Sequence, residues 1–199
     1  MDSYQRENER LTEGYKVNGL WFAYTNGEVL AAQMTRIASF KPIESESARI
    51  LILGSMPGVI SLAAKQYYAH PRNAFWKIMS VILEFPETSA YEKRISALQD
   101  AGIALWDVLR TCVRNGSLDA NIEPESVKAN DIPKFLRKHP HIEIVAFNGA
   151  TAEKCYERLV LPKLKNCHAH YIRLPSTSPA HAALLFDDKV AAWRTILRD

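Results

Sequence analysis

The segment from Gln66 to Trp76, which reads QYYAHPRNAFW, gathers aromatic, basic and amide side chains within eleven positions. Pro71 suits the first position of a helix, because its ring presets the helical φ angle and its missing N–H is not needed there. The free N–H groups of that first turn, beside Arg72 and Asn73, would attract an anion. With Tyr68 on the preceding loop, the segment suits a flat heterocycle attached to a phosphate backbone.

A purely structural interpretation explains part of the same segment. Phe75 and Trp76 then fill the interior, Tyr67 and Tyr68 are partly buried, and His70 caps the helix. We prefer this interpretation for Phe75 and Trp76.

A glycine-rich loop, GSMPG at residues 54–58, directly follows a short apolar run. Glycines at a strand end allow the backbone to approach a ligand closely. The loop lacks the GxxxxGK[ST] pattern of phosphate loops, the dinucleotide fingerprint and the GxSxG nucleophile elbow. Taken alone, it predicts a structural turn.

A second loop, LPSTSPAH at residues 174–181, is stiffened by two prolines and opens the last helical pattern. Its small hydroxyl residues, Ser176, Thr177 and Ser178, could contact phosphate or could simply cap that helix. The nearby Cys167–His170 resembles a metal motif, but only His168 and His170 would share a strand face. With no further ligand nearby, we expect no zinc site.

Four continuous apolar runs, each typical of a strand buried on both faces, predict the elements that position these loops. They lie at residues 49–54, 102–106, 142–147 and 169–174. Helical patterns lie between or after them, at residues 75–83, 91–99, 132–138, 152–160 and 181–197. This alternation predicts an α/β fold with a parallel sheet covered on both faces, and such sheets bind ligands at the carboxyl ends of their strands.

Residues 1–47 differ from the rest, and we expect an N-terminal extension followed by one domain at residues 48–199. Leu20–Tyr24 and Glu28–Ala32 flank Asn26–Gly27, a turn signal that favours a β-hairpin. Lys41–Ser47, with a proline and several Ser and Glu residues, is typical of a linker.

The net charge of +3 hides an uneven distribution. Ser47–Leu83 and Arg158–Phe186 contain no Asp or Glu but four Lys or Arg each, so the remaining chain is net acidic. Basic segments on an acidic body are expected to face a polyanion, although buried strands and loops are poor in carboxylates for other reasons.

Composition excludes several classes of protein. The chain has 199 residues, 47% of them hydrophobic and 24% charged, which is ordinary for a globular protein. No apolar run approaches the ~20 residues that span a bilayer, and the charged N-terminus does not look like a secretory signal. The three cysteines do not suit a disulfide scaffold or a four-cysteine cluster. We therefore expect a cytoplasmic, DNA-associated protein without a membrane partner.

Five motifs together carry a family resemblance: GSMPG, QYYAHPRNAFW, LWDVL with GSLD (Gly116–Asp119), FNG and LPSTSPAHA. The set resembles the hypoxanthine-DNA glycosylases of the uracil-DNA glycosylase superfamily, from about Phe40 to about Trp193. The mismatch-specific uracil glycosylases share the HPxNxFW stretch. The resemblance implies a three-layer α/β/α sandwich around a four-stranded parallel sheet. It also implies a monofunctional, base-flipping glycosylase that acts as a monomer, without a metal or cofactor.

The resemblance implies roles for particular residues. Many relatives position the attacking water with a loop Asp or Asn, but Met56 stands at that position here, and Asn73 is expected to act instead. Tyr68 matches the ring that stacks on the flipped base. Asp107 matches an amide that reads the base edge, and Leu174 stands where several relatives have a polar residue.

A mechanism can be written on these residues. We expect a carboxylate at Asp107 to accept a hydrogen bond from N1–H of hypoxanthine and to reject adenine, which has no such proton. Loop residues Ser55, Met56 and Gly58 would bind the base, with backbone amides donating to O6. His70 or His181 could supply a proton to the leaving base.

Contacts to double-stranded or single-stranded DNA are expected from the acid-free segments, with the loop near Pro179–His181 entering the gap left by the flipped base. The DNA-binding residues predicted are Lys65, Arg72, Arg173, Ser176, Thr177, Ser178 and His181. Three alternatives stay open: a uracil- or mismatch-directed glycosylase, a non-catalytic module that binds damaged DNA, and a domain acting on a free nucleotide.

Overall fold

A computed structural model describes residues 14–17, 20–25, 28–32, 36–164, 168–181 and 184–197, the first three ranges by their backbone only. At its centre is a four-stranded sheet in the order β10-β9-β5-β6, and every neighbouring pair is parallel. The strands are β5 (Ile50–Gly54), β6 (Ile103–Asp107), β9 (Ile144–Asn148) and β10 (His170–Leu174). The predicted parallel sheet is confirmed.

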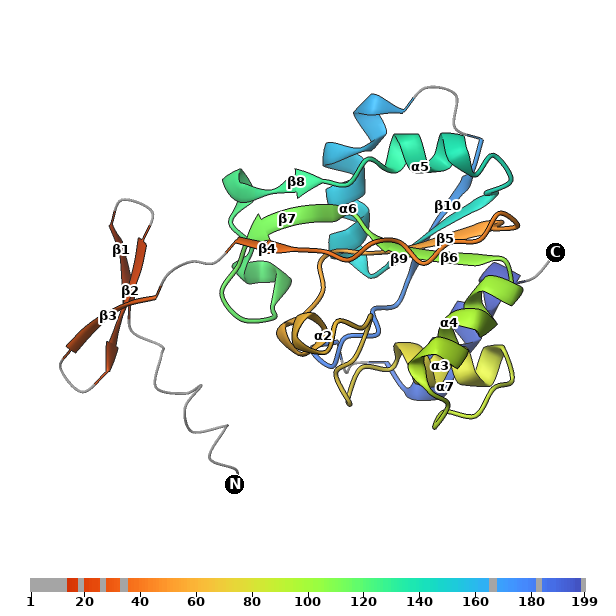
Figure 1. Cartoon of the computed structure of the whole chain (residues 1–199), viewed down its shortest axis with the longest axis horizontal. Helices are drawn as coiled ribbons and strands as arrows, with labels where there is room; N and C mark the ends of the chain where they lie inside the picture. The colour runs from red at the N-terminus through yellow and green to blue at the C-terminus, as the bar shows by residue number, and fades with distance from the viewer. Residues whose placement is uncertain are drawn as a thin grey trace.

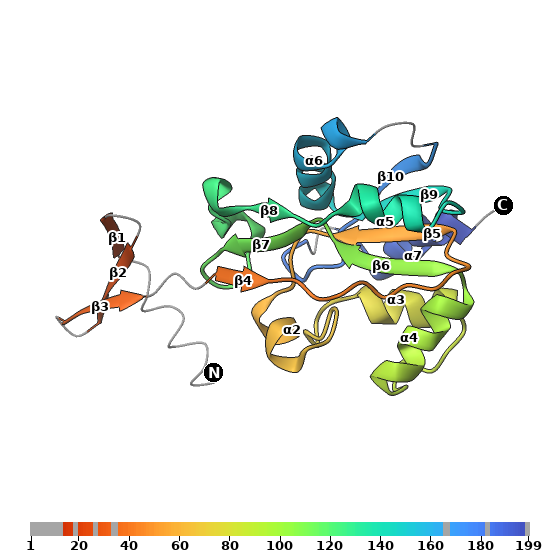
Figure 2. The ribbon, with the colours of Figure 1, turned by 45° about the horizontal axis from the view of Figure 1, so that its top comes forward.

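Helices cover both faces of this sheet (Figures 1 and 2). On one face lie α3 (Phe75–Ile82), α4 (Tyr91–Asp100) and α7 (Phe186–Arg194). On the other lie α5 (Ile132–Lys138) and α6 (Ala150–Leu159). The three-layer α/β/α architecture is therefore confirmed.

The strands are buried on both faces because successive side chains point to opposite sides. Ile50 and Ile52 of β5 join the cluster under α3, α4 and α7, which also buries Trp193. Leu51 and Leu53 join the cluster under α5 and α6. Each fully buried side chain of this size contributes roughly 1.5–3 kcal/mol to folding, and the two clusters together hold the sheet rigid.

Several short elements were not predicted. A second, antiparallel sheet in the order β4-β7-β8 is formed by β4 (Arg36–Ala38), β7 (Leu109–Val113) and β8 (Lys128–Ala129). Helix α2 (Val59–Ala64) follows the glycine-rich loop. The described residues also form four 3-10 turns: η2 (Asp119–Asn121), η3 (Pro124–Ser126), η4 (Leu161–Lys163) and η5 (Thr195–Leu197).

The N-terminal region contains an antiparallel sheet in the order β1-β2-β3. Its strands are β1 (Gly14–Val17), β2 (Leu20–Thr25) and β3 (Glu28–Ala32). The pairing of β2 with β3 ends at Thr25 and Glu28, while the expected Asn26–Gly27 turn lies outside the described residues. The division of the chain at residue 47 stays a prediction.

The segment predicted as a linker, Lys41–Ser47, is instead packed along the edge of β6. The backbones of Ile43 and Leu105 exchange two hydrogen bonds, of 2.9 and 2.8 Å, and Ile43 is buried. The side chain of Gln99 donates to the Glu44 carbonyl oxygen at 2.8 Å. The linker interpretation was wrong because the segment is mostly polar, and its composition does not reveal that Ile43 is buried against β6.

Helix α7 begins at Phe186, five residues later than the pattern predicts. The chain before it turns, with the His181 N–H donating to the Ser178 carbonyl oxygen. Asp187 and Asp188 occupy the first turn, where negative charge stabilises a helix start. Of the helices described, none is both long enough and apolar enough to cross a membrane.

Candidate active site

The four central strands end at one edge of the sheet. Gly54 of β5 is opposite Asp107 of β6, and Asn148 of β9 is opposite Leu174 of β10. These terminal residues therefore lie side by side beneath the loops that follow them. This is the edge at which open parallel sheets bind ligands.

Asp107 is the most unusual of these residues, because its carboxyl group is buried with little to compensate it. The residue is only 3% exposed, and its Oδ2 atom has no hydrogen-bond partner among the described residues. Burial, with a contribution from the charge of Asp119, raises the pKa of Asp107 to about 8, although Arg114 opposes the shift. This raised pKa favours the neutral form of the carboxyl group near pH 7, whereas we expected a carboxylate. A neutral acid can donate to N1 of adenine as well, so the expected rejection of adenine does not follow from it.

Tyr68 reaches the same place from the loop before α3. Its hydroxyl is buried and has no hydrogen-bond partner in the described part of the chain. Burial and the charge of Asp107 raise the pKa of Tyr68 above its usual value, although the nearby Asn148 side chain, which does not reach hydrogen-bonding geometry, acts in the opposite direction. The ring stacks on Phe75 with centroids 4.1 Å apart, and the backbone has a φ of 53°, which is uncommon for a residue other than glycine.

Gly54 leaves room for both groups. A Cβ atom on Gly54 would stand 2.6 Å from Oδ1 of Asp107 and 3.0 Å from the Tyr68 hydroxyl. Real Cβ atoms essentially never make a contact as short as the first, and the second is tighter than nine in ten Cβ contacts. The close approach of these side chains therefore requires glycine at the end of β5.

A polar network lines the glycine-rich loop. The Ser55 hydroxyl donates to Oδ2 of Asp119 at 2.7 Å, and Nη1 of Arg114 lies 3.7 Å from Oδ1 of Asp119. Arg114 is buried, and its guanidinium also donates to the backbone oxygens of Gly116 and Pro57. Burial raises the pKa of Asp119, while Ser55 and Arg114 act in the opposite direction.

The predicted loop residues differ in their surroundings. Met56 is 6% exposed and packs in the apolar cluster under α5 and α6, so its side chain belongs to the core of this structure. Gly58 caps α2 and is partly exposed, with Ser117 nearby. Contact of Ser55, Met56 and Gly58 with a base stays a prediction, and the packing of Met56 favours contact through its backbone.

Asn73 lies just before α3 rather than inside it, and Ala74 occupies the cap position. Its Oδ1 accepts a hydrogen bond from the N–H of Phe75 at 2.9 Å, and the helix begins at Phe75 instead of Pro71. The chain first makes a turn in which the His70 carbonyl oxygen accepts from Asn73 N–H. The prediction of Pro71 as the first helical residue was wrong because this turn precedes the helix.

The two candidate proton donors have different environments. Nδ1 of His70 accepts a hydrogen bond from Arg72 N–H at 3.0 Å, so the lone pair of that nitrogen is engaged within the turn that precedes α3. His181 is exposed, and its carbonyl oxygen accepts from Nζ of the buried Lys189 at 2.8 Å. Its ring is therefore the freer of the two to face a ligand.

The LPSTSPAH loop is anchored through Thr177, which is 1% exposed. Asn148 donates to the Thr177 hydroxyl at 2.8 Å and accepts from its N–H at 2.9 Å. The Thr177 carbonyl oxygen accepts from Ala74 N–H, which ties the loop to the start of α3. The hydroxyl and N–H of Thr177 are thus already bonded to Asn148, which makes Thr177 an anchor of the loop, and its DNA contact stays a prediction.

The other predicted DNA-binding residues are at least partly accessible. Ser176 and Ser178 are half-buried, and their hydroxyl oxygens accept hydrogen bonds from the backbone N–H groups of Ser178 and Ala180, respectively. Lys65 and Arg72 are exposed, whereas the exposed Arg173 is paired with Glu153 at 3.0 Å.

Three residues of the site were missed by the sequence reasoning. Asn148 ends β9, and the rule that ligands bind at strand ends could have found it. Asp119 lies in the GSLD motif, but nothing in the sequence connects it to Ser55. Nothing in the sequence around Arg114 indicates that it is part of the site, because its partners Pro57 and Asp119 come from two separate loops.

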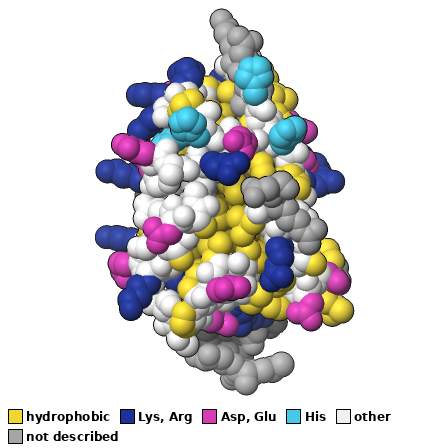
Figure 3. Space-filling view, turned by 90° about the vertical axis from the view of Figure 1, so that its right-hand side faces the viewer, with side chains coloured by type: hydrophobic (Ala, Val, Ile, Leu, Met, Phe, Trp, Pro, Cys, Tyr) yellow, Lys and Arg dark blue, Asp and Glu magenta, His cyan; other side chains and the backbone are white. Residues whose placement is uncertain are grey.

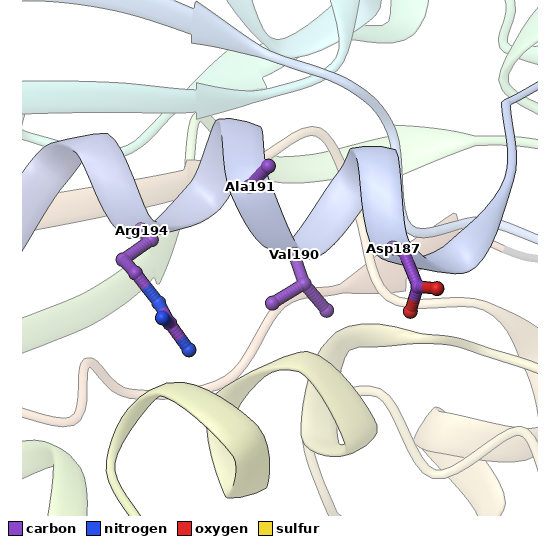
Figure 4. A pocket seen from close by; sticks show the side chains of 4 residues that line it. All are labelled: Asp187, Val190, Ala191 and Arg194. Carbon is purple, nitrogen blue, oxygen red and sulfur yellow. The ribbon is translucent and has the colours of Figure 1, made fainter.

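Other surfaces offer less chemistry. Among the described residues no group of three His, Cys, Asp or Glu side chains could hold a metal ion, and Cys167 lies outside them. Figure 3 views the end of the molecule where the central strands begin, and it shows an apolar band bordered by charged residues. A shallow depression of ≈220 Å³ lies on α7, lined by Asp187, Val190, Ala191 and Arg194 (Figure 4). It contains none of the predicted site residues.

Comparison with known proteins supports the resemblance. The model of the Uracil DNA glycosylase superfamily matches residues 41–197. A Hypoxanthine DNA glycosylase from Methanosarcina barkeri is 40% identical over 111 residues, which are 55% of this chain and 69% of that protein. Another, from Methanosarcina acetivorans, is 33% identical over 160 residues, or 80% of this chain and 96% of the relative.

A solved structure agrees with the fold. The solution NMR structure of a candidate uracil DNA glycosylase from Methanosarcina acetivorans has a TM-score of 0.68 and 30% identity. It covers 82% of this chain and 98% of its own. Fold and site thus define a parallel α/β/α domain with a buried polar floor at the strand ends. The chain belongs to the uracil DNA glycosylase superfamily.

Proposed function

We propose that this protein is a DNA glycosylase that releases hypoxanthine from deoxyinosine by hydrolysing the N-glycosidic bond, which leaves an abasic site. The observation that carries the proposal is the 33% identity to a Hypoxanthine DNA glycosylase over 96% of that relative. Membership of the uracil DNA glycosylase superfamily favours the same reaction class.

The position of the site at the strand ends supports base flipping. A base stacked in a duplex cannot reach a floor formed by Asp107 and Gly54, so the target nucleotide must leave the stack. Tyr68 provides the aromatic face, and stacking on such a ring contributes about 1–3 kcal/mol per base. Ser55 and Gly58 border the same loop and bind the base through their polar backbone groups.

Asn73 is proposed as the catalytic residue that orients the attacking water. Its Oδ1 already accepts one hydrogen bond, from Phe75 N–H, and has a second lone pair for a water molecule. An amide is a poor base, so its contribution is the position of the water relative to C1′ of the sugar. Anchoring by the helix start fixes that position.

DNA is expected to bind across the loops around the site, as damaged duplex and to a single copy of the protein. Lys65 and Arg72 provide exposed positive charge. Ser176, Ser178 and His181 border the opposite loop. Arg173 is a weaker candidate because Glu153 already neutralises its charge.

Uracil is the second candidate substrate, and a specific observation favours it. The neutral carboxyl group of Asp107 can accept from an N–H and donate to a neighbouring oxygen. Hypoxanthine presents that pair as N1–H and O6, and uracil presents it as N3–H and O4. Asp107 alone therefore does not separate the two bases.

The test is single-turnover cleavage of matched duplexes containing hypoxanthine, uracil or only normal bases, with the released base identified by mass spectrometry. We expect release of hypoxanthine at the highest rate and none from the normal duplex. Preferential release of uracil would show that uracil, rather than hypoxanthine, is the preferred base, while the proposed hydrolysis of the N-glycosidic bond would stand. Salt-sensitive DNA binding without any base release would instead identify a non-catalytic binding module.

A further inference from the structure

We propose that Asp107 works as a neutral carboxylic acid whose O–H donates a hydrogen bond to the exocyclic oxygen of the departing base, and thereby stabilises the negative charge that the base acquires. The inference rests on the proposed function and adds to it the group that stabilises the leaving base.

The first argument is geometric. Asp107 ends β6 at the ligand-binding edge of the sheet, is 3% exposed, and has an Oδ2 atom without a partner among the described residues. The Tyr68 hydroxyl, also buried without a hydrogen-bond partner there, approaches Gly54 from the loop before α3, so both groups lie close to the end of β5. Buried polar groups left unsatisfied are rare in folded proteins and need an explanation, and we assign them to contact with the flipped base.

The second argument concerns the charge that this position tolerates. The titratable groups that act on or are influenced by Asp107 are Tyr67, Tyr68, Arg114 and Asp119. The tyrosine hydroxyls are neutral and Asp119 is an acid. The Arg114 guanidinium donates to two backbone oxygens and lies 3.7 Å from Asp119; its Nη1 has no hydrogen-bond partner among the described residues, and its charge only partly offsets the burial of Asp107. An ionised Asp107 would therefore be a buried anion beside a second acid, which is strongly unfavourable.

The third argument comes from the chemistry of the bond cleaved. When the C1′–N9 bond breaks, its electron pair moves onto the base and spreads to O6. The water oxygen bonds to C1′, and one of its protons finally neutralises the base. Leu174, at the end of the neighbouring strand β10, cannot donate to this charge. An acid at Asp107 can donate to O6 and accept from N1–H, whereas a carboxylate would repel the growing charge.

The test is the pH dependence of single-turnover hypoxanthine excision, at saturating enzyme, for the wild type, Asp107→Asn and Asp107→Ala. The wild-type rate should be level below about pH 8 and fall about tenfold per pH unit above it. Asp107→Asn keeps a donor and an acceptor but cannot ionise, so it should stay within about tenfold of wild type at pH 7 and lose this fall. Asp107→Ala should lose about 100-fold at pH 7.

Two controls assign the high-pH fall to Asp107. Ionisation of N1–H of the substrate affects the wild type and Asp107→Asn equally, so only the difference between their profiles reports the residue. Asp119→Asn removes a negative charge that raises the Asp107 pKa, so the fall should move to lower pH. Circular dichroism and thermal unfolding show whether each variant is folded.

The outcomes separate this inference from the proposed function. A wild type that releases no base at any pH contradicts the proposed function. A wild type that is active but has the same high-pH profile as Asp107→Asn overturns the inference alone. So does a folded Asp107→Asn protein that is as inactive as Asp107→Ala.

Discussion

Gly54 ends β5 at the point where two side chains from distant parts of the chain approach its Cα atom. Asp107 comes from the neighbouring strand and Tyr68 from the loop before α3. The absence of a side chain at this position is therefore a structural requirement of the floor. It follows from packing rather than from φ, because Gly54 is not among the glycines with a positive φ angle.

Gly54→Ala should destabilise the protein and impair excision, because the new Cβ atom would stand 2.6 Å from the Asp107 carboxyl group. Overpacking of this kind costs about 1–3 kcal/mol of unfolding free energy. Thermal unfolding and urea titration measure the loss. Gly58→Ala is the matched control for stability, since its Cβ would meet Ser117 Oγ at 3.4 Å. Equal stability losses in the two variants would contradict this account of Gly54.

The family resemblance carried by the motifs allowed prediction of Tyr68, Asn73 and Asp107 as site residues, and the structure brings Tyr68 and Asp107 together beside Gly54. The protonation of Asp107 could not be predicted, because it depends on burial by residues far away in the sequence. Met56 and Thr177 were assigned to ligand contacts from their loops, and only the three-dimensional structure reveals that both side chains are buried.

Among the elements, the four central strands were predictable because continuous apolar runs bounded by glycine or proline suit no other buried structure of that length. The short antiparallel sheet was not, because β4 and β8 have three and two residues and no apolar pattern. The edge segment Lys41–Ser47 was misassigned for the same reason. Its position depends on contacts with β6, α4 and α5 that leave no periodic signal in the sequence.

Glu44 is the side chain that fixes this edge segment to α5. It accepts hydrogen bonds from Nζ of Lys138 at 2.9 Å and pairs with Nε2 of His139 at 2.6 Å. Burial alone would raise the pKa of Glu44, but the two bonds outweigh it, so the pKa is lowered. A lowered pKa means that the ionised form stabilises the folded state, above the usual pKa of a glutamate.

Glu44→Gln should therefore lower the Tm at pH 7 by about 2–4 °C, which corresponds to roughly 1 kcal/mol for a partly exposed charged hydrogen bond. The difference from wild type should shrink as the pH falls through the lowered pKa, because Glu44 is then protonated in both states. Glu143→Gln is the control, since it alters an exposed pair with Arg49. A Glu44→Gln deficit that persists unchanged at pH 3 would contradict the assignment.

At the scale of the whole molecule, the two acid-free segments supply the charge expected to meet DNA. Lys65 and Arg72 are exposed, whereas Arg173 is bonded to Glu153 across from β10 to α6. The sequence predicted all three as equivalent contacts. The pairing of Arg173 distinguishes them, because an arginine already neutralised by a carboxylate releases fewer counterions from the phosphate backbone.

Lys65→Ala and Arg72→Ala should each weaken duplex binding and reduce the slope of log K against log salt by about 1. Arg173→Ala should change the slope by less than either. Fluorescence anisotropy with a labelled deoxyinosine duplex, between low and physiological salt, measures all three. If all variants and the wild type had the same slope, these basic residues would not contact the DNA.

The most direct test of the account is the rate of hypoxanthine release by Asn73→Ser under single-turnover conditions. A serine hydroxyl can also accept a hydrogen bond from Phe75 N–H, so the free energy of unfolding should fall by less than the ~0.5–2 kcal/mol that the loss of such a bond at a helix start costs. Its short hydroxyl cannot hold the water at the same place. We predict that wild type releases hypoxanthine and that folded Asn73→Ser is at least about 100-fold slower. Release at the wild-type rate by folded Asn73→Ser would contradict the assignment of Asn73 and of the reaction to this site.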